Sequence, residues 1–147
     1  MMRDRTKNIV EILTALLICL FVYAAINKLT EYSMFVAQLK FHPLFKYFAG
    51  LLAWIIPAAE LITTGLLVFP LTRRTGLYTS AALLSSFTVY LIVMISTNSH
   101  LPCSCGGIIS GFTWRQHIVF NLVFLALAVT GILLDKRKDK TAVSFSP

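Results

Sequence analysis

Long apolar runs separated by short polar segments dominate the chain. Four of these runs are long enough to cross the hydrocarbon core of a membrane, which takes a helix of about 20 largely apolar residues. The predicted spans are residues 9–29, 47–69, 77–97 and 114–134. The pattern predicts an all-α integral membrane protein in which residues 1–134 form one domain, a bundle of four transmembrane helices.

The segment between the first two spans has a helical pattern of its own. Four apolar residues recur there at the i, i+3, i+4, i+7 spacing of one helix face, namely Tyr32, Phe35, Val36 and Leu39. His42-Pro43 ends the pattern, because proline does not continue a helix. We expect a short amphipathic helix in this first outer loop, where it serves either as an anchor in the membrane interface or as a surface on which a partner docks.

Composition supports the membrane assignment. Hydrophobic residues make up 57% of the chain and charged residues only 13%, well below the roughly one quarter of a soluble domain. The formal net charge is +7, and the basic residues stand in short clusters at the ends of the apolar runs. This placement is typical of topology signals and of contacts with anionic lipids, and it argues against nucleic acid as a partner.

The basic clusters also predict an orientation. Nine Lys and Arg residues lie in the two termini and in the loop between the second and third spans, whereas four lie on the other side, in the other two loops and at the adjoining end of the first span. The positive-inside rule therefore puts both termini in the cytoplasm and the first and third loops outside. In a bacterium this corresponds to the cytoplasmic (inner) membrane, with the third loop in the periplasm. Residues 135–147, charged and then Ser-rich, are expected to form a disordered cytoplasmic tail.

The third loop carries the sequence Pro102-Cys103-Ser104-Cys105-Gly106-Gly107. Two thiols one residue apart can close a small, strained ring, and strain makes a disulfide easy to reduce and competent for exchange. The periplasm is oxidising, so disulfide chemistry suits this side of the membrane. Three other interpretations stay open: inert thiols, a purely structural disulfide, or a soft metal ion such as Cu(I) with His100 as a third ligand. Cys19, alone in the first span, is expected to be a small packing residue.

Glu60 is the one acidic residue of the second predicted span. A carboxylate at that depth is costly unless it is protonated, paired or exposed to a wet cavity. Pro57 frees a backbone carbonyl one turn earlier, and Thr63 and Thr64 share the same face. Glu60 is therefore either a functional group, which relays protons or contacts a quinone, or a buried carboxyl that holds the helices together through hydrogen bonds.

Polar residues of the first and fourth spans are expected to meet just beneath the cysteine loop if the bundle is compact. Trp114, His117 and Asn121 share one face of the fourth span, and Asn27-Lys28 closes the first span at the same level. His117 is a candidate to give or take the proton that thiol exchange requires. Alternatively, Trp114 and His117 belong to an interfacial belt, the two asparagines bond between helices, and Lys28 snorkels outward.

The order of these motifs has a counterpart in a known family. The motifs are Ala25-Ile26-Asn27-Lys28-Leu29, Pro57-Ala58-Ala59-Glu60-Leu61, Arg73-Arg74, Cys103-Ser104-Cys105-Gly106-Gly107, Trp114 and Asn121. Over about residues 9–134 the chain resembles the DoxX/MauE group of four-helix membrane proteins, and most of all its MauE-like branch, the methylamine-utilisation accessory type. The resemblance implies periplasmic disulfide formation or electron delivery to a partner, often a thioredoxin-like protein. The DoxX side of the group is linked to quinone-coupled sulfur oxidation.

Three hypotheses follow. In the first, Cys103 and Cys105 cycle between dithiol and disulfide. They exchange electrons with a periplasmic thioredoxin-like or client protein and with a membrane carrier such as quinone. Glu60 and His117 give and take the protons of these steps. A lone cysteine pair has no second pair with which to relay electrons, which weakens an enzymatic role. In the second, the chain is a non-catalytic subunit or assembly factor of a larger envelope complex, with a structural cysteine loop. In the third, it is a transporter or metal handler that uses Glu60 in a midplane site.

Overall fold

The computed structural model describes the backbone of residues 2–41, 44–97 and 114–143, and these residues form helices and no strand. The helices are α1 (Met2–Thr30), α2 (Tyr32–Phe41), α3 (Ala49–Val68), α4 (Arg73–Thr97) and α5 (Trp114–Val143). All except the short α2 are long and apolar enough to cross a membrane. The predicted all-α fold with four membrane-spanning helices is thereby confirmed.

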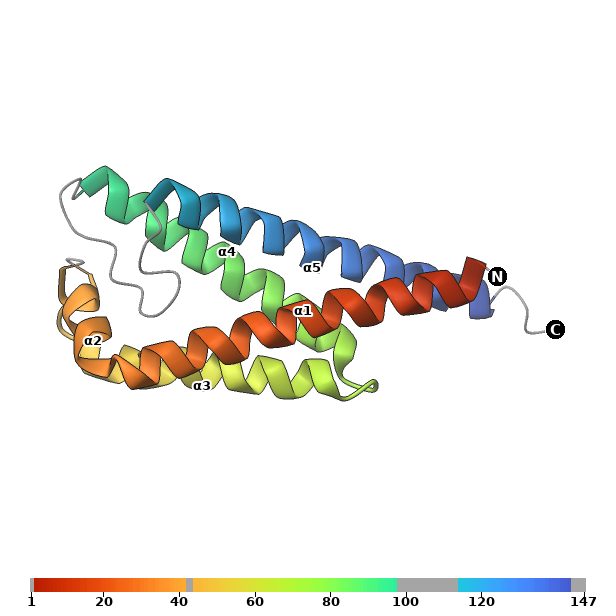
Figure 1. Cartoon of the computed structure of the whole chain (residues 1–147), viewed down its shortest axis with the longest axis horizontal. Helices are drawn as coiled ribbons and strands as arrows, with labels where there is room; N and C mark the ends of the chain where they lie inside the picture. The colour runs from red at the N-terminus through yellow and green to blue at the C-terminus, as the bar shows by residue number, and fades with distance from the viewer. Residues whose placement is uncertain (1, 42–43, 98–113, 144–147) are drawn as a thin grey trace.

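The four long helices run alternately in opposite directions along the long axis of the molecule (Figure 1). α1 packs chiefly against α3, α3 contacts α4 as well, and α4 packs against α5, which returns to contact α1. Each helix is therefore antiparallel to both of its neighbours, as in other up-and-down four-helix bundles. α1 begins and α5 ends at one end of the bundle, and α2 lies at the opposite end, where α4 ends and α5 begins (Figure 1).

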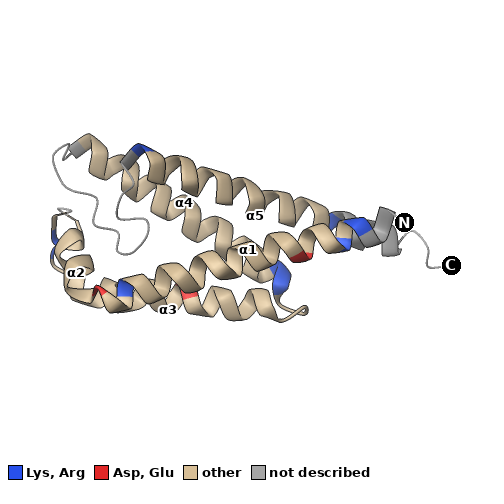
Figure 2. Ribbon diagram, in the orientation of Figure 1, with Lys and Arg blue, Asp and Glu red and all other residues tan. Residues whose placement is uncertain are grey.

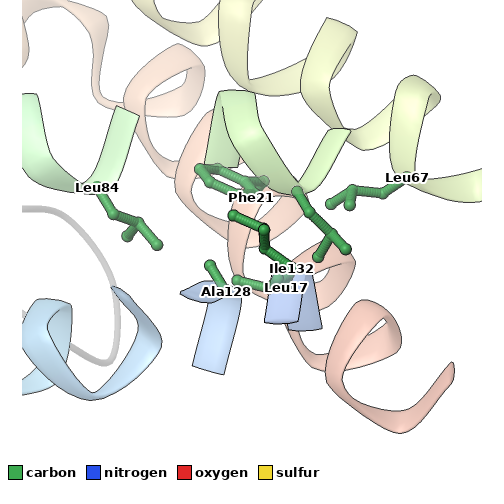
Figure 3. Close-up of a cluster of buried hydrophobic side chains, with 7 residues drawn as sticks. Leu17, Phe21, Leu67, Leu84, Ala128 and Ile132 are labelled. Carbon is green, nitrogen blue, oxygen red and sulfur yellow. The ribbon is translucent and has the colours of Figure 1, made fainter. Parts of the chain in front are cut away.

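All four long helices contribute to one core cluster of apolar side chains (Figure 3). Its buried members are Leu17, Phe21, Leu67, Leu77, Leu84, Ala128 and Ile132. The outer surface is also apolar, as the exposed side chains of Ile12 and Leu133 illustrate. In lipid there is little hydrophobic gain from burying one apolar side chain rather than another, so close packing selects the inner face.

α2 is the helix predicted in the first outer loop. Its apolar face packs on α3, where Phe35 and Leu39 are buried against Ala49 and Ala53. The small alanine side chains let the two helices approach closely. α2 thus joins the bundle through its apolar face, and its location in the membrane interface stays a prediction.

Three of the four long helices, α1, α4 and α5, extend beyond the predicted spans. α1 begins at Met2, α4 begins at Arg73, and α5 continues through residues 135–143, where the sequence predicts a disordered tail. Hydropathy identifies only the part of a helix that fits the hydrocarbon layer. Once a helix has formed, each added residue gains a backbone hydrogen bond, so the helix can continue beyond that layer at small cost. Lys and Arg near a helix C-terminus also interact favourably with its dipole, which suits the basic end of α5.

The charged residues lie mostly toward the two ends of the bundle (Figure 2). Toward the end of the bundle at which α1 begins lie the basic residues Arg5 and Lys7 on α1, Arg73 and Arg74 at the start of α4, and Lys136 on α5. Those toward α2 are Lys28, Lys40, Lys46 and Arg115. Which of these ends faces the cytoplasm stays a prediction from the positive-inside rule.

Candidate functional site

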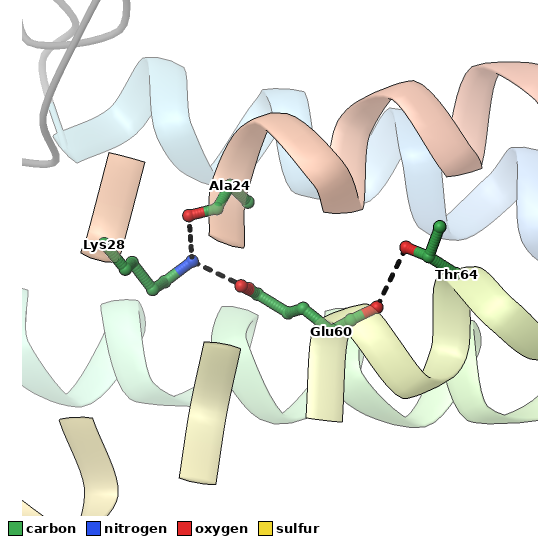
Figure 4. A network of polar contacts seen from close by, with 4 residues as sticks. All are labelled: Ala24, Lys28, Glu60 and Thr64. Carbon is green, nitrogen blue, oxygen red and sulfur yellow. Dashed lines mark hydrogen bonds and ion pairs between the residues drawn. The ribbon is translucent and has the colours of Figure 1, made fainter. Parts of the chain in front are cut away.

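An ion pair inside the bundle joins α1 to α3 (Figure 4). Lys28 Nζ lies 2.7 Å from Glu60 Oε1, and the two side chains are 13% and 8% exposed. Lys28 Nζ also donates to the backbone carbonyl of Ala24 at 3.4 Å. The Thr64 hydroxyl donates to the backbone carbonyl of Glu60 rather than to its carboxylate. The carboxylate of Glu60 is therefore held by Lys28, which meets the requirement that a charge at this depth be paired.

The antiparallel arrangement explains how these two residues meet. Side chains on a helix lean toward its N-terminus. Lys28, two residues before the end of α1, therefore leans back into the bundle, whereas Glu60, roughly 16 Å along α3 from its first residue, leans toward α2. Because α1 and α3 run in opposite directions, the two side chains lean toward each other (Figure 4).

The position of Lys28 corrects one expectation from the sequence. Its side chain does not snorkel outward but lies within the bundle, bonded to Glu60. Two aromatic rings face its ammonium group, with Nζ 5.9 Å from the ring centre of Phe35 and 5.2 Å from that of Phe87. Cation–π attraction from both rings adds to the ion pair, and together these contacts account for the inward orientation.

A pocket lies beside the ion pair, at the end of the bundle that carries α2. Its volume, counted as the space open to the centres of water-sized molecules, is about 90 Å³, and the pocket is partly open to its surroundings. Its polar lining residues are Tyr23, Asn27, Lys28, Glu31, Gln38, Tyr90, His117 and Asn121. A second pocket of about 80 Å³ shares Lys28 and Asn121 with the first and reaches Glu60. One water needs about 10–15 Å³ on this measure, so each pocket has room for several waters.

Several buried polar atoms at these pockets have no hydrogen-bond partner among the described residues. They are Gln38 Nε2 and Asn121 Nδ2, both amide donors, and Glu60 Oε2, an acceptor. Taken as whole residues, Asn121 is only 7% exposed and Glu60 6%. A buried polar group without a partner costs about 1–3 kcal/mol, so such atoms mark places where water or a ligand would bind.

The predicted site residues have different outcomes. His117 and Asn121 are buried and line the same pocket as Asn27, so the expected meeting of the first and fourth spans is confirmed. Glu60 is paired inside the bundle, and whether it also handles protons stays a prediction. Cys103 and Cys105 lie outside the described residues, as does the side chain of Trp114.

Cys19 differs from its predicted role as a packing residue, because its side chain is exposed on α1. A thiol is apolar enough to face lipid, so no inward position is needed. As for a metal site, no three His, Cys, Asp or Glu side chains come together within the described parts of the chain. His100, the third ligand considered for a soft metal, lies outside those parts.

Two features of the site were not predicted from the sequence, namely a pocket residue on α2 and the partner of Glu60. Gln38 lines the pocket from α2, three residues after the buried Phe35, so its position on the inner face follows once α2 is known to pack on α3. The partner of Glu60 could have been found by charge complementarity, because Lys28 is the one basic residue within the first predicted span. What the sequence did not provide is the register of α1 against α3.

Comparison with known proteins places these features in a family. The family model described as methylamine utilisation protein MauE matches residues 6–134. The matched region covers all four candidate membrane spans except Arg5 and the last two residues of the fourth span, and it contains every residue of the two pockets. Neither the curated proteins nor the solved structures give a match.

Proposed function

The chain belongs to the MauE family of membrane proteins, and from this membership we propose that it is a membrane-embedded thiol–disulfide redox protein. Its Cys103–Cys105 disulfide accepts two electrons from the dithiol of a periplasmic partner by thiol–disulfide exchange, and the partner leaves with a disulfide of its own. The Cys103/Cys105 dithiol then gives two electrons and two protons to a membrane quinone. The disulfide is thereby restored and the quinone becomes a quinol.

The observation that carries this proposal is the position of the polar pocket. It lies at the end of the bundle where α4 ends and α5 begins, and the segment that contains Cys103 and Cys105 joins these two helices. Polar groups buried in a membrane bundle are costly and are typical of functional sites. A pocket of this kind at the end of the bundle to which the cysteine segment is attached supports redox chemistry there.

The charged and titratable groups of the pocket suit the two protons of the reaction. His117 lies in the first turn of α5 and lines the larger pocket, and Glu60 lines the adjoining one. Lys28 contacts both pockets and bonds to Glu60. We assign His117 and Glu60 to proton transfer between the thiols and the carrier, with Lys28 holding the Glu60 carboxylate in place.

A redox titration of the cysteine pair in membranes tests the proposal. Free thiols are trapped with a mass-tag reagent across a series of dithiothreitol and glutathione potentials, in a Cys19→Ala background. Cys19 is exposed and would otherwise add a third labelled thiol. We expect a reversible two-electron transition with a midpoint between about −120 and −270 mV.

The matched variants Cys103→Ser and Cys105→Ser each leave one thiol, which can form only a mixed disulfide with glutathione, so the intramolecular two-electron transition should disappear. Protein that keeps Cys19 should give the same midpoint for the Cys103/Cys105 pair. A disulfide that survives well below about −300 mV, or a pair of thiols that never oxidises, would contradict the redox proposal.

The family description supports a second candidate, a non-catalytic accessory role in methylamine utilisation. Such a subunit would need the bundle and its surface but not the thiols. In a strain that lacks the gene, growth on methylamine restored equally well by the wild type and by the Cys103→Ser/Cys105→Ser variant would favour this role. Loss of growth in the variant, at unchanged protein level, would favour the redox function.

A further inference from the structure

We propose that the pocket enclosed by α1, α2, α4 and α5 binds a neutral, flat ring that carries carbonyl oxygens, a molecule of the quinone class. The inference rests on the proposed function and deepens it, because such a molecule is the electron carrier that the reaction needs. The pocket, rather than the cysteine loop, is assigned as the site that holds the ring.

The hydrogen-bonding groups of the pocket require a ligand with acceptors. Gln38 Nε2 and Asn121 Nδ2 are buried donors without a partner among the described residues, and the residues that carry them line the pocket from α2 and α5. The ammonium group of Lys28 has three N–H bonds, of which the described contacts with Glu60 and Ala24 use two. Carbonyl oxygens on a ligand would satisfy donors of this kind, whereas a further donor would not.

The charges of the pocket favour a neutral ligand. The positive charge of Lys28 is already balanced by Glu60 at 2.7 Å. An anion would also meet the carboxylate of Glu31, which lines the pocket and is exposed. A cation would meet Lys28 and the two unpartnered donors. Either ion would lose its favourable interaction with water on entering the pocket. A carbonyl oxygen carries only a partial charge, so its transfer from water costs less free energy.

The walls of the pocket suit a flat ring. Phe35, Phe87, Tyr90 and Phe120 line it, and the rings of Phe87 and Tyr90 lie 5.9 Å apart between centroids. Aromatic faces pack well against a planar ligand. A dry cavity of about 150 Å³ holds a benzene molecule. The pocket itself has about 90 Å³ and is partly open, so a ring of this size would fill it and extend through its opening.

The test compares two ligands that differ only in their oxygens. The full-length chain in lipid nanodiscs is titrated calorimetrically with a short-tailed alkyl benzoquinone and with the corresponding alkylbenzene, and the heats for empty nanodiscs are subtracted. We expect the wild type to bind the benzoquinone at least tenfold more tightly than the alkylbenzene. Gln38→Leu and Asn121→Leu should each weaken benzoquinone binding about three- to tenfold, the effect of a lost hydrogen bond, and leave the alkylbenzene unaffected.

Asn8→Leu is the matched control, because Asn8 is exposed on α1 and does not line the pocket. It should change neither affinity. Thermal melting without ligand checks folding, and Gln38→Leu, on the short α2, serves if Asn121→Leu does not fold. Equal affinity of the wild type for the two compounds, or benzoquinone binding that neither pocket variant changes, would overturn the proposal.

The experiments can refute the proposed quinone pocket and the proposed redox function independently of each other. Benzoquinone binding should persist in the Cys103→Ser/Cys105→Ser variant, because the pocket residues belong to the helices. Selective binding together with a cysteine pair that does not titrate would refute the redox function and support the pocket. A pair that titrates as expected in a protein without preference for the benzoquinone would refute the pocket and leave the redox function standing.

Discussion

Breaking the Lys28–Glu60 ion pair from one side should destabilise the bundle far more than replacing both partners. The perturbation is a double-mutant cycle of Lys28→Met, Glu60→Leu and the combined variant. Each single change leaves one charged group inside the bundle, with a side chain that is 13% exposed for Lys28 or 8% for Glu60. The combined change leaves two apolar side chains of similar length, which pack without any charge to solvate.

The distance between the charges sets the magnitude. At 2.7 Å between Nζ and Oε1, two unit charges attract by about 6 kcal/mol at an effective dielectric constant of about 20. Removing both groups from water offsets much of that attraction, so the pair contributes little net stability. Removal of one partner loses the attraction but keeps the desolvation of the other. We expect each single variant to lower the free energy of unfolding by about 3–5 kcal/mol, and the double variant to lie within about 1 kcal/mol of wild type.

Reversible unfolding by SDS in mixed micelles, followed by circular dichroism, measures all four proteins. The predicted losses give a coupling energy of at least about 5 kcal/mol between the two sites, whereas sites that do not interact add within about 0.5 kcal/mol. Lys40→Met is the matched control, because Lys40 is exposed on α2, outside the four candidate membrane spans, and it should change stability by no more than about 0.5 kcal/mol. Additive losses in the cycle would refute the ion pair as a buried, coupled contact.

Two further predictions concern packing. Gly76→Ala should destabilise the bundle by about 1–3 kcal/mol, because its Cβ would lie 2.9 Å from the backbone nitrogen of Leu67. Gly65→Ala has nothing within 4 Å of the new Cβ and should be neutral or stabilising by up to about 1 kcal/mol, so equal thermal shifts would contradict the close approach of α3 and α4. Phe35→Ala should cost about 3–5 kcal/mol and speed amide exchange throughout α2, whereas Phe41→Ala, at an exposed position, should do neither.

The four spans could be predicted from the sequence because lipid imposes a simple condition. A helix that crosses the hydrocarbon layer needs about 20 apolar residues, and such runs are visible without knowledge of their neighbours. The inner faces could not be predicted in the same way. Ile12 on α1 is exposed whereas Leu17 is fully buried, although both are large aliphatic residues of one span. Close packing between particular helices determines which of the two residues is buried, and the hydropathy of the sequence carries no information on that packing.

The sequence identified most residues of the candidate site but not the contacts between them. Glu60, His117 and Asn121 stood out because polar groups within membrane spans are costly. The orientation of Lys28 could not be predicted, because a lysine near the end of a span can reach either the membrane interface or the interior of the bundle. Which of the two it reaches depends on the position of α1 along α3. Gln38 depended on the docking of α2, because an isolated amphipathic pattern predicts a helix and not the surface that it covers.

The ion pair raises a question that stability alone does not answer. An apolar pair at Lys28 and Glu60 would hold α1 to α3 about as firmly, since buried ion pairs give little net stabilisation over well-packed apolar residues. What an apolar pair lacks is an ammonium group on the pocket wall and a carboxylate that can hold a proton beside it. The Lys28→Met/Glu60→Leu variant should therefore melt near the wild-type temperature but bind the benzoquinone at least tenfold more weakly, since bonds to charged donors are worth about 1.5–3 kcal/mol. Wild-type affinity in that stable variant would show that the charges serve neither the bundle nor the ligand.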